Sequence, residues 1–213
     1  MVEQRQEFQR ALEDIEAKVN GLFATVAEDL PGATYAIVSG SNEVLGVLAE
    51  REQAIDALYR EIDALASREI LLQAPVASDL RFLLSVVRLV PELERSHDLV
   101  VQIAARADRV PGDDLSPVTR TLVERMGDVA AVMWRQAADS WRHRDPAVAM
   151  ALGTRHDQMN ELHAGLVAEL ASGRTALPVA MEMTLAAHFY KRLGDHAVNV
   201  ARRAAYLAGS VPG

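Results

Sequence analysis

The sequence contains no cysteine, which excludes disulfides, thiolate metal sites and cysteine nucleophiles together. It also contains no run approaching 18 consecutive apolar residues, so no segment is expected to span a membrane. No basic block stands out, and the net charge of −8 argues against a general nucleic-acid-binding protein. The first residues are polar and carry no apolar signal core, so a cytoplasmic protein is expected.

Aromatic residues make up only 5% of the chain, and glycine and proline are scarce, whereas half of the 213 residues are apolar. Alanine, leucine and valine dominate that half, a composition typical of helical proteins. Apolar residues recur at helical spacing over six stretches. The expected helices run from about 4 to 29, 44 to 72, 76 to 108, 118 to 142, 146 to 171 and 178 to 208.

Breakers and caps mark the ends of these helices. The pair Pro31-Gly32 predicts a kink or an interruption of the first helix, and Ser41 or Asn42 is expected to cap the second. Pro75 suits the first turn of the third helix, and Asp145 is the expected cap of the fifth.

The order of these elements indicates an internal duplication. Three helices over residues 1–110 are followed by a turn-rich joint at 111–117 and by three more helices over 118–213. Short connections between long neighbours favour antiparallel packing. We therefore predict an all-α protein that is a tandem repeat of two antiparallel three-helix bundles.

The third helix of each repeat carries a charged motif late in its length. The first reads Pro91-Glu-Leu-Glu-Arg-Ser-His-Asp98, and the second reads Tyr190-Lys-Arg-Leu-Gly-Asp-His196, offset by 97 residues. In the first copy, helical spacing places Glu94 on an apolar seam with Leu83, Val90 and His97. A buried carboxylate requires a cation or an ion-pair partner, so Glu94 is the strongest functional signal in the sequence.

Together with Leu72-Gln-Ala-Pro-Val-Ala-Ser-Asp-Leu-Arg81, these motifs resemble the PhoU family of regulators of bacterial phosphate uptake. The family's motifs are close to E-R-I-G-D-H-A and L-Q-x-P-x-A-x-D-L-R, and the resemblance extends over nearly the whole chain. It implies a tandem three-helix fold and a homodimer. It also implies an adaptor role between a phosphate ABC transporter, through its ATPase, and a phosphate-sensing histidine kinase, which represses phosphate-starvation genes.

In some PhoU relatives the E-x-x-x-D pairs bind metal ions, helped by an acid from the neighbouring helix. By this resemblance the metal-ligand candidates are Glu94, Asp98 and Asp195, although Lys191 stands where the second copy should carry a glutamate. Additional candidates are His97, which replaces the usual glycine, and Glu52 and Asp157 as neighbouring-helix acids. The ion would be Mg²⁺, Mn²⁺, iron or Zn²⁺.

Other interpretations remain open from the residues alone. Glu94 and Asp98 could pair with some of the 20 arginines instead of a metal, and Lys191 could pair with Asp195. Glu94 and His97 also form the E-x-x-H of ferritin-like di-iron enzymes, but no second E-x-x-H accompanies it. An accessory protein of another anion carrier is a further alternative.

Three expectations concern residues outside the motifs. Trp134 and Trp141 share a helix face and are expected in the core, and Arg81 is expected to bridge to a neighbouring helix rather than to bind a ligand. No phosphate loop, nucleophile elbow or paired acid and base occurs. The sequence therefore predicts a protein that is not an enzyme and for which phosphate need not be a ligand.

Overall fold

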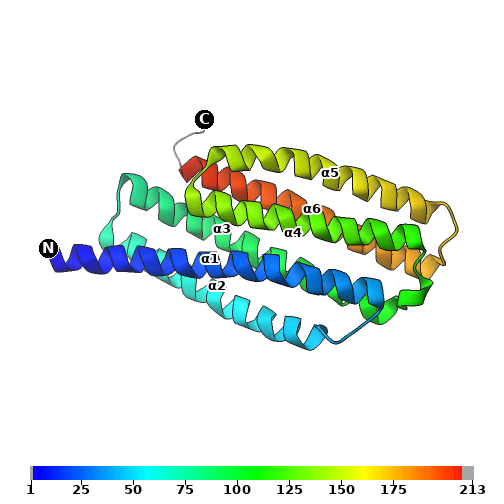
Figure 1. Ribbon diagram of the computed structural model, residues 1–213. Coiled ribbons are helices and arrows are strands. Elements are labelled where there is room, and N and C mark those ends of the chain that lie inside the picture. Colours follow the sequence, from blue (N-terminus) through cyan, green and yellow to red (C-terminus); the bar gives the residue numbers. More distant parts are fainter. Residues whose placement is uncertain (1, 208–213) are drawn as a thin grey trace.

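The computed structural model describes residues 2–207 and is all-helical, with no β-strand in that range (Figure 1). The six helices and two short 3-10 segments are α1 (Val2–Ser39), α2 (Leu45–Gln73), α3 (Ala77–Ala104), η1 (Ala107–Arg109), η2 (Gly112–Asp114), α4 (Pro117–His143), α5 (Pro146–Ala171) and α6 (Leu177–Leu207). The predicted fold class, two antiparallel three-helix bundles in tandem, is confirmed.

The two bundles pack against each other along their lengths, so the molecule is elongated (Figure 1). Helices α1 and α3 of the first bundle contact α4 and α6 of the second, whereas α2 and α5 lie on the outside. One hydrophobic cluster extends through both bundles and includes all six helices. None of the described helices is both long enough and apolar enough to cross a membrane.

Helix α1 does not break where the sequence predicted an interruption. It continues through Pro31 to Ser39, because the residues on both sides of the proline face the same core. Leu30, Ala33 and Ile37 are all fully buried. Proline inside a helix removes one backbone hydrogen bond and costs about 3 kcal/mol. Burial of large apolar side chains, at about 1.5–3 kcal/mol each, outweighs that loss.

Two other predicted helix starts also differ from the structure. The residue that precedes α2 is Val44, which makes no side-chain capping bond; Ser41 instead accepts a hydrogen bond from the Glu43 N–H within the turn. Pro75 lies before α3 rather than in its first turn, because the helix begins at Ala77. The predicted cap of α5 is confirmed, since the carboxylate of Asp145 accepts from the backbone N–H of Ala147 at 2.8 Å.

The joint between the bundles is packed against the end of α1. Gly40 and Gly112 approach so closely that a Cβ on Gly112 would lie 2.4 Å from the carbonyl oxygen of Ser39. The guanidinium of Arg120 in α4 donates to the carbonyls of both Val38 and Gly112, each at 2.8 Å. These two hydrogen bonds connect α4 of the second bundle to the end of α1 and to the joint.

Both tryptophans lie in the core, as predicted. Trp134 and Trp141 are fully buried in α4, and both rings lie 6.3 Å from the ring of Phe23 in α1. Near the end of α1, the hydroxyl of Thr34 bonds to the phenol of Tyr190 in α6 at 2.8 Å. Both sets of contacts join the two bundles.

Candidate functional site

The first charged motif lies on the surface of α3 that faces α2. The fully buried line of α3 runs through Leu83, Val90, Leu93 and His97, so Glu94 is only partly buried and lies beside the seam rather than in it. The sequence placed Glu94 on the seam because it shifted the helical pattern by one residue. The Glu94 carboxylate is therefore less buried than the sequence predicted, and its charge state depends on the residues around it.

Those neighbours are acids. Glu52 and Asp56 of α2 lie beside Glu94 and Asp98 of α3, and Glu52, Asp56 and Asp98 each influence the ionisation of other members of the group. We call these four residues the acidic cluster. Within residues 2–207, no member of the acidic cluster forms an ion pair with a lysine, arginine or histidine. Four carboxylates therefore share one partly buried surface without a matching cation.

Ionisation of three members, Glu52, Glu94 and Asp98, is disfavoured. Burial, followed by repulsion from Asp98 and Asp56, raises the pKa of Glu94. Burial and the neighbouring charge of Asp98 raise the pKa of Glu52. The pKa of Asp98 is raised by burial and by Asp56. Arg95 opposes the pKa shifts of Glu94 and Asp98 but does not reverse them.

The donor set of the acidic cluster suits a hard divalent cation, because all four groups supply oxygen atoms and negative charge. A bound cation would remove the repulsion that raises these pKa values. No three acidic or histidine side chains in the described part of the chain converge on one point as they stand. Metal binding thus requires the carboxylates of α2 and α3 to turn toward a common centre.

His97 points away from the acidic cluster and into the first bundle. Its Nε2 lies 3.0 Å from the carboxylate of Asp29 in α1, and both side chains are almost completely buried. Arg51 of α2 pairs with the same carboxylate. His97 and Glu94 therefore serve different contacts, and the structure does not assemble a ferritin-like E-x-x-H site from them. His97 Nδ1 is buried and has no hydrogen-bond partner among the described residues.

The second motif has a different balance of charge. Lys191 Nζ lies 3.1 Å from one carboxylate oxygen of Asp195, and His156 Nε2 lies 2.6 Å from the other. Burial alone would raise the pKa of Asp195, but the hydrogen bonds from His156 and Lys191 hold it below its usual value. His156 thus takes the place that Glu52 has beside Asp98, and Asn160, four residues on, bonds to His156.

The structure places the remaining sequence candidates as follows. Glu52 does lie beside Asp98, whereas Asp157 is exposed and His156, its neighbour, contacts Asp195 instead. Asp56 is a member of the acidic cluster that the sequence reasoning did not name. A signal for it existed, because Glu52 and Asp56 repeat the Glu-x-x-x-Asp spacing of Glu94 and Asp98 one helix earlier.

Comparison with known families agrees with this architecture. The family model described as "PhoU domain" matches residues 19–107 and again residues 123–204, one match in each bundle. A phosphate-specific transport system accessory protein PhoU homolog from Synechocystis sp. is 29% identical over 216 residues, covering 96% of this chain and 92% of that protein. PhoU homolog 1 from Mycobacterium tuberculosis is 27% identical, with coverage of 96% and 94%.

Solved structures are similar in fold. A crystal structure of PhoU from Pseudomonas aeruginosa superposes with a TM-score of 0.89 at 24% identity, covering 96% of this chain and all of that one. The phosphate transport system regulatory protein PhoU from Streptococcus pneumoniae gives a TM-score of 0.84 at 22% identity, with coverage of 94% and 96%. At these identities the structures establish the shared fold.

Proposed function

The chain belongs to the PhoU family, and from that membership we propose that it is an accessory regulator of phosphate transport. The observation that carries the proposal is the match of both bundles to the PhoU domain, in a chain that aligns along nearly the full length of its relatives. We further propose that the protein is a cytoplasmic homodimer. It connects a phosphate ABC transporter to a phosphate-sensing histidine kinase and keeps the kinase in its repressing state.

Features of the fold support an adaptor that acts through contacts between proteins. Long helices present ridges and grooves suited to a partner helix. Exposed apolar side chains gather at one end of the second bundle, where Leu177, Met181 and Leu185 of α6 lie beside Val167 of α5. Exposed apolar patches of this kind often mark sites of protein–protein interaction. The proposed role requires no catalysis by this chain.

A metal at the acidic cluster is the second part of the proposal. Glu52, Asp56, Glu94 and Asp98 would hold a hard or borderline divalent ion, with Mg²⁺, Mn²⁺, iron and Zn²⁺ as the candidates. The ion would supply positive charge and would connect α2 to α3, which stiffens the outer surface of the first bundle. Asp195 is not expected to hold a metal, because Lys191 and His156 already occupy its oxygens.

The adaptor role is tested by deleting the gene for this chain in the organism that carries it. We expect a phosphatase reporter of phosphate starvation to be switched on in phosphate-rich medium, and a plasmid copy of the gene to restore repression. Affinity purification of a tagged copy should retain the transporter ATPase and the kinase. Unchanged repression in the deletion strain, or recovery of a different anion carrier without the kinase, would contradict the proposed adaptor role.

A further inference from the structure

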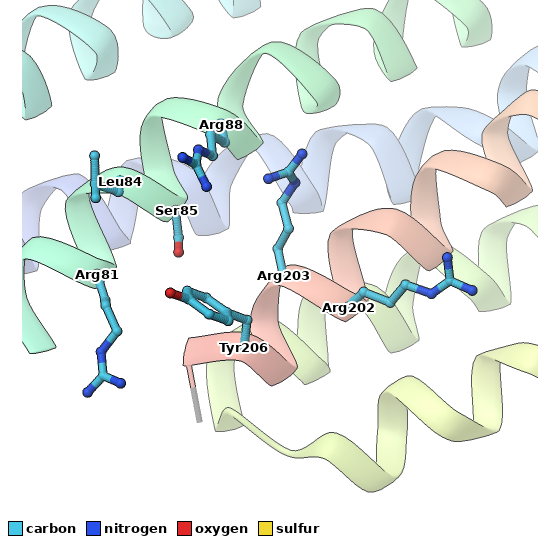
Figure 2. Close-up of a pocket in the computed structure, with 7 residues that line it drawn as sticks. All are labelled: Arg81, Leu84, Ser85, Arg88, Arg202, Arg203 and Tyr206. Atoms are coloured by element: carbon cyan, nitrogen blue, oxygen red, sulfur yellow. The ribbon is translucent and has the colours of Figure 1, made fainter. Parts of the chain in front are cut away.

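A hollow lined by arginines lies between the start of α3 and the end of α6, on a different surface from the acidic cluster. It has a volume of about 310 Å³. Its lining consists of Arg81, Leu84, Ser85 and Arg88 from α3 and Arg202, Arg203 and Tyr206 from α6. Figure 2 shows Arg88 and Arg203 on opposite helices with their guanidinium groups near each other, and the hydroxyls of Ser85 and Tyr206 facing each other below them.

Within residues 2–207, no acid forms an ion pair with these four arginines. The arginines that form ion pairs within residues 2–207 are Arg51, Arg106, Arg109, Arg142, Arg144 and Arg174, and none of them lines the hollow. The flanking acids of α3 have other contacts: Asp79 accepts from Ser78, and Glu92 faces His196 at 3.9 Å. Arg81, expected from the sequence to bridge to a neighbouring helix, forms no such bridge among the described residues.

The internal repeat supplies a direct comparison for this hollow. Applying the 97-residue offset of the two motifs, Ser85 corresponds to Glu182, Arg106 corresponds to Arg203, and Arg109 corresponds to Tyr206. At that other end of the pair α3 and α6, Glu182 pairs with Arg106 at 2.9 Å and with Arg109 at 3.4 Å. A built-in carboxylate therefore neutralises arginine at one end, and at the other end a serine leaves the corresponding space open.

We propose that this hollow, which we call the arginine hollow, binds a small molecule that carries a diphosphate or triphosphate group. Guanidinium groups bind phosphate oxygens in a bidentate manner and stay charged at all working pH values. Arg88 and Arg203 face the space between the helices, whereas Arg81 and Arg202 extend outward at its rim (Figure 2). Their positive charges oppose the three to four negative charges of such a group. The volume lies at the lower end of the range of small-molecule sites, and it is roughly ten times the volume of one water molecule.

Two further lining residues fit this class of ligand. Ser85 is buried to 6% exposure and directs its hydroxyl into the arginine hollow, where it can donate to a phosphate oxygen. Tyr206 is 52% exposed and offers a ring on which a nucleobase can stack. Pyrophosphate and a nucleoside triphosphate share the phosphate chemistry. Only the nucleotide carries a base that could stack on the Tyr206 ring, so this ring would favour the nucleotide.

The test is calorimetric titration of the full chain at fixed ionic strength in EDTA, which keeps the acidic cluster free of metal. We expect pyrophosphate and ATP to bind once per chain, and orthophosphate, AMP and sulfate to bind at least about tenfold more weakly. ATP that binds more tightly than pyrophosphate, with the difference removed by Tyr206→Ala, identifies a nucleotide. Equal affinity identifies the phosphate chain alone as the recognised group.

Three variants decide where binding occurs. Ser85→Glu copies the built-in carboxylate of the other end and should weaken pyrophosphate binding at least about tenfold, as should Arg203→Gln. Arg109→Gln, the matched control at the other end, should leave it unchanged. Circular dichroism and the melting temperature establish that each variant is folded; if Ser85→Glu misfolds, Arg203→Gln carries the test.

Several outcomes would overturn the proposal. They are the absence of pyrophosphate and ATP binding, an equal loss in Arg109→Gln, or unaltered binding in folded Ser85→Glu and Arg203→Gln. Binding of a phosphoserine peptide but of no small phosphate would instead make the arginine hollow a docking site for protein. The proposal is independent of the regulatory function. Pyrophosphate binding is measured on the purified protein, whereas repression and co-purification are measured separately in cells, so either test can fail without the other.

Discussion

The two charged motifs occupy matching places on a repeated scaffold, yet they balance charge in opposite ways. In the first bundle, four carboxylates from α2 and α3 lie together, and burial together with neighbouring carboxylates raises the pKa of Glu52, Glu94 and Asp98. In the second bundle, a single carboxylate remains, and Lys191 and His156 hold the pKa of Asp195 low. The same family model matches both bundles, so the difference lies in the side chains that each motif gathers.

This contrast shows that a repeated fold can keep a site in the same place while changing the charge balance of its side chains. In the acidic cluster, a cation from outside would relieve the repulsion. The second motif contains its own cation, since an ammonium four residues before a carboxylate on a helix pairs with it directly. A duplicated protein can thus keep one responsive copy and one copy whose charge is permanently satisfied.

The largest expected effect comes from removing the carboxylates that distinguish the first motif. We expect the purified protein to contain about one divalent ion per chain, and Glu94→Ala/Asp98→Ala to lose it, because two of the four oxygen donors are removed. Elemental analysis after gel filtration measures this. Asp195→Ala is the matched control and should keep the ion. If the double variant retains the same metal content, the acidic cluster is not the binding site.

The converse change should turn the second motif into the first. Lys191→Glu removes the built-in cation and places two carboxylates beside His156, so a second divalent ion per chain should bind under saturating metal. The same elemental analysis, after removal of free metal, reports the change from about one ion to about two. Lys191→Gln serves as the control, because it removes the cation without adding a ligand. Unchanged stoichiometry in Lys191→Glu would refute the idea that Lys191 replaces a metal.

A third comparison concerns the residue just before the aspartate of each motif. His97 is buried against Asp29, whereas the matching Gly194 is contacted by Met159 and Met133. Asp29→Ala leaves a buried imidazole without its acceptor and should lower the free energy of unfolding by about 2–4 kcal/mol. Urea denaturation measures the loss. Asp195→Ala, at a more exposed pair, should lower it by less than about 1 kcal/mol; equal losses would contradict the distinction.

The smallest effect is on stability as a function of pH in metal-free protein. The folded-state pKa of Glu94 is raised above its ordinary value of 4.5, so its protonated form contributes stability below that pH, and the contribution is lost as pH rises. Glu94→Gln should therefore raise the melting temperature at pH 7 by about 1–2 °C, the effect of roughly 0.5 kcal/mol of repulsion. Below pH 4 the variant and the wild type should melt together.

For Asp195 the sign is reversed. Its folded-state pKa lies below the ordinary 3.8, so it contributes stability above that value and loses it as pH falls through the folded pKa. Asp195→Asn should lower the melting temperature at pH 7 by about 1–2 °C, with the difference shrinking in acid. Shifts of the same sign in Glu94→Gln and Asp195→Asn would show that the two motifs do not differ in charge balance.

Much of the fold could be predicted from the sequence, because helical periodicity, turn residues and the internal repeat all indicate the same six helices. Pro31 misled the prediction, since a local rule for helix breaking does not include the burial of Leu30 and Ile37 on either side. Glu94 was placed one step too deep because a period of 3.6 residues allows two adjacent seams on one helix. Both errors came from tertiary packing that overrides a local pattern.

The candidate site was less predictable. Asp56 could have been found from the spacing that it shares with Glu52, but nothing local puts His156 rather than Asp157 against Asp195. That register between antiparallel α5 and α6 depends on the shape of the loop at 172–176, which periodicity does not encode. The arginine hollow was beyond sequence reasoning for a related reason. Arg81 and Arg203 are far apart in the chain, and the lack of an acid between them is visible only after folding.

Lys191 has a consequence for how the whole molecule can be approached. A perfect duplication would present two interchangeable faces, and a partner that senses charge could dock on either one, in orientations related by a half turn. With one lysine in place of a glutamate, one face stays acidic and the other is neutralised. The two faces are therefore distinguishable, and a partner that senses charge would have a reason to choose one of them.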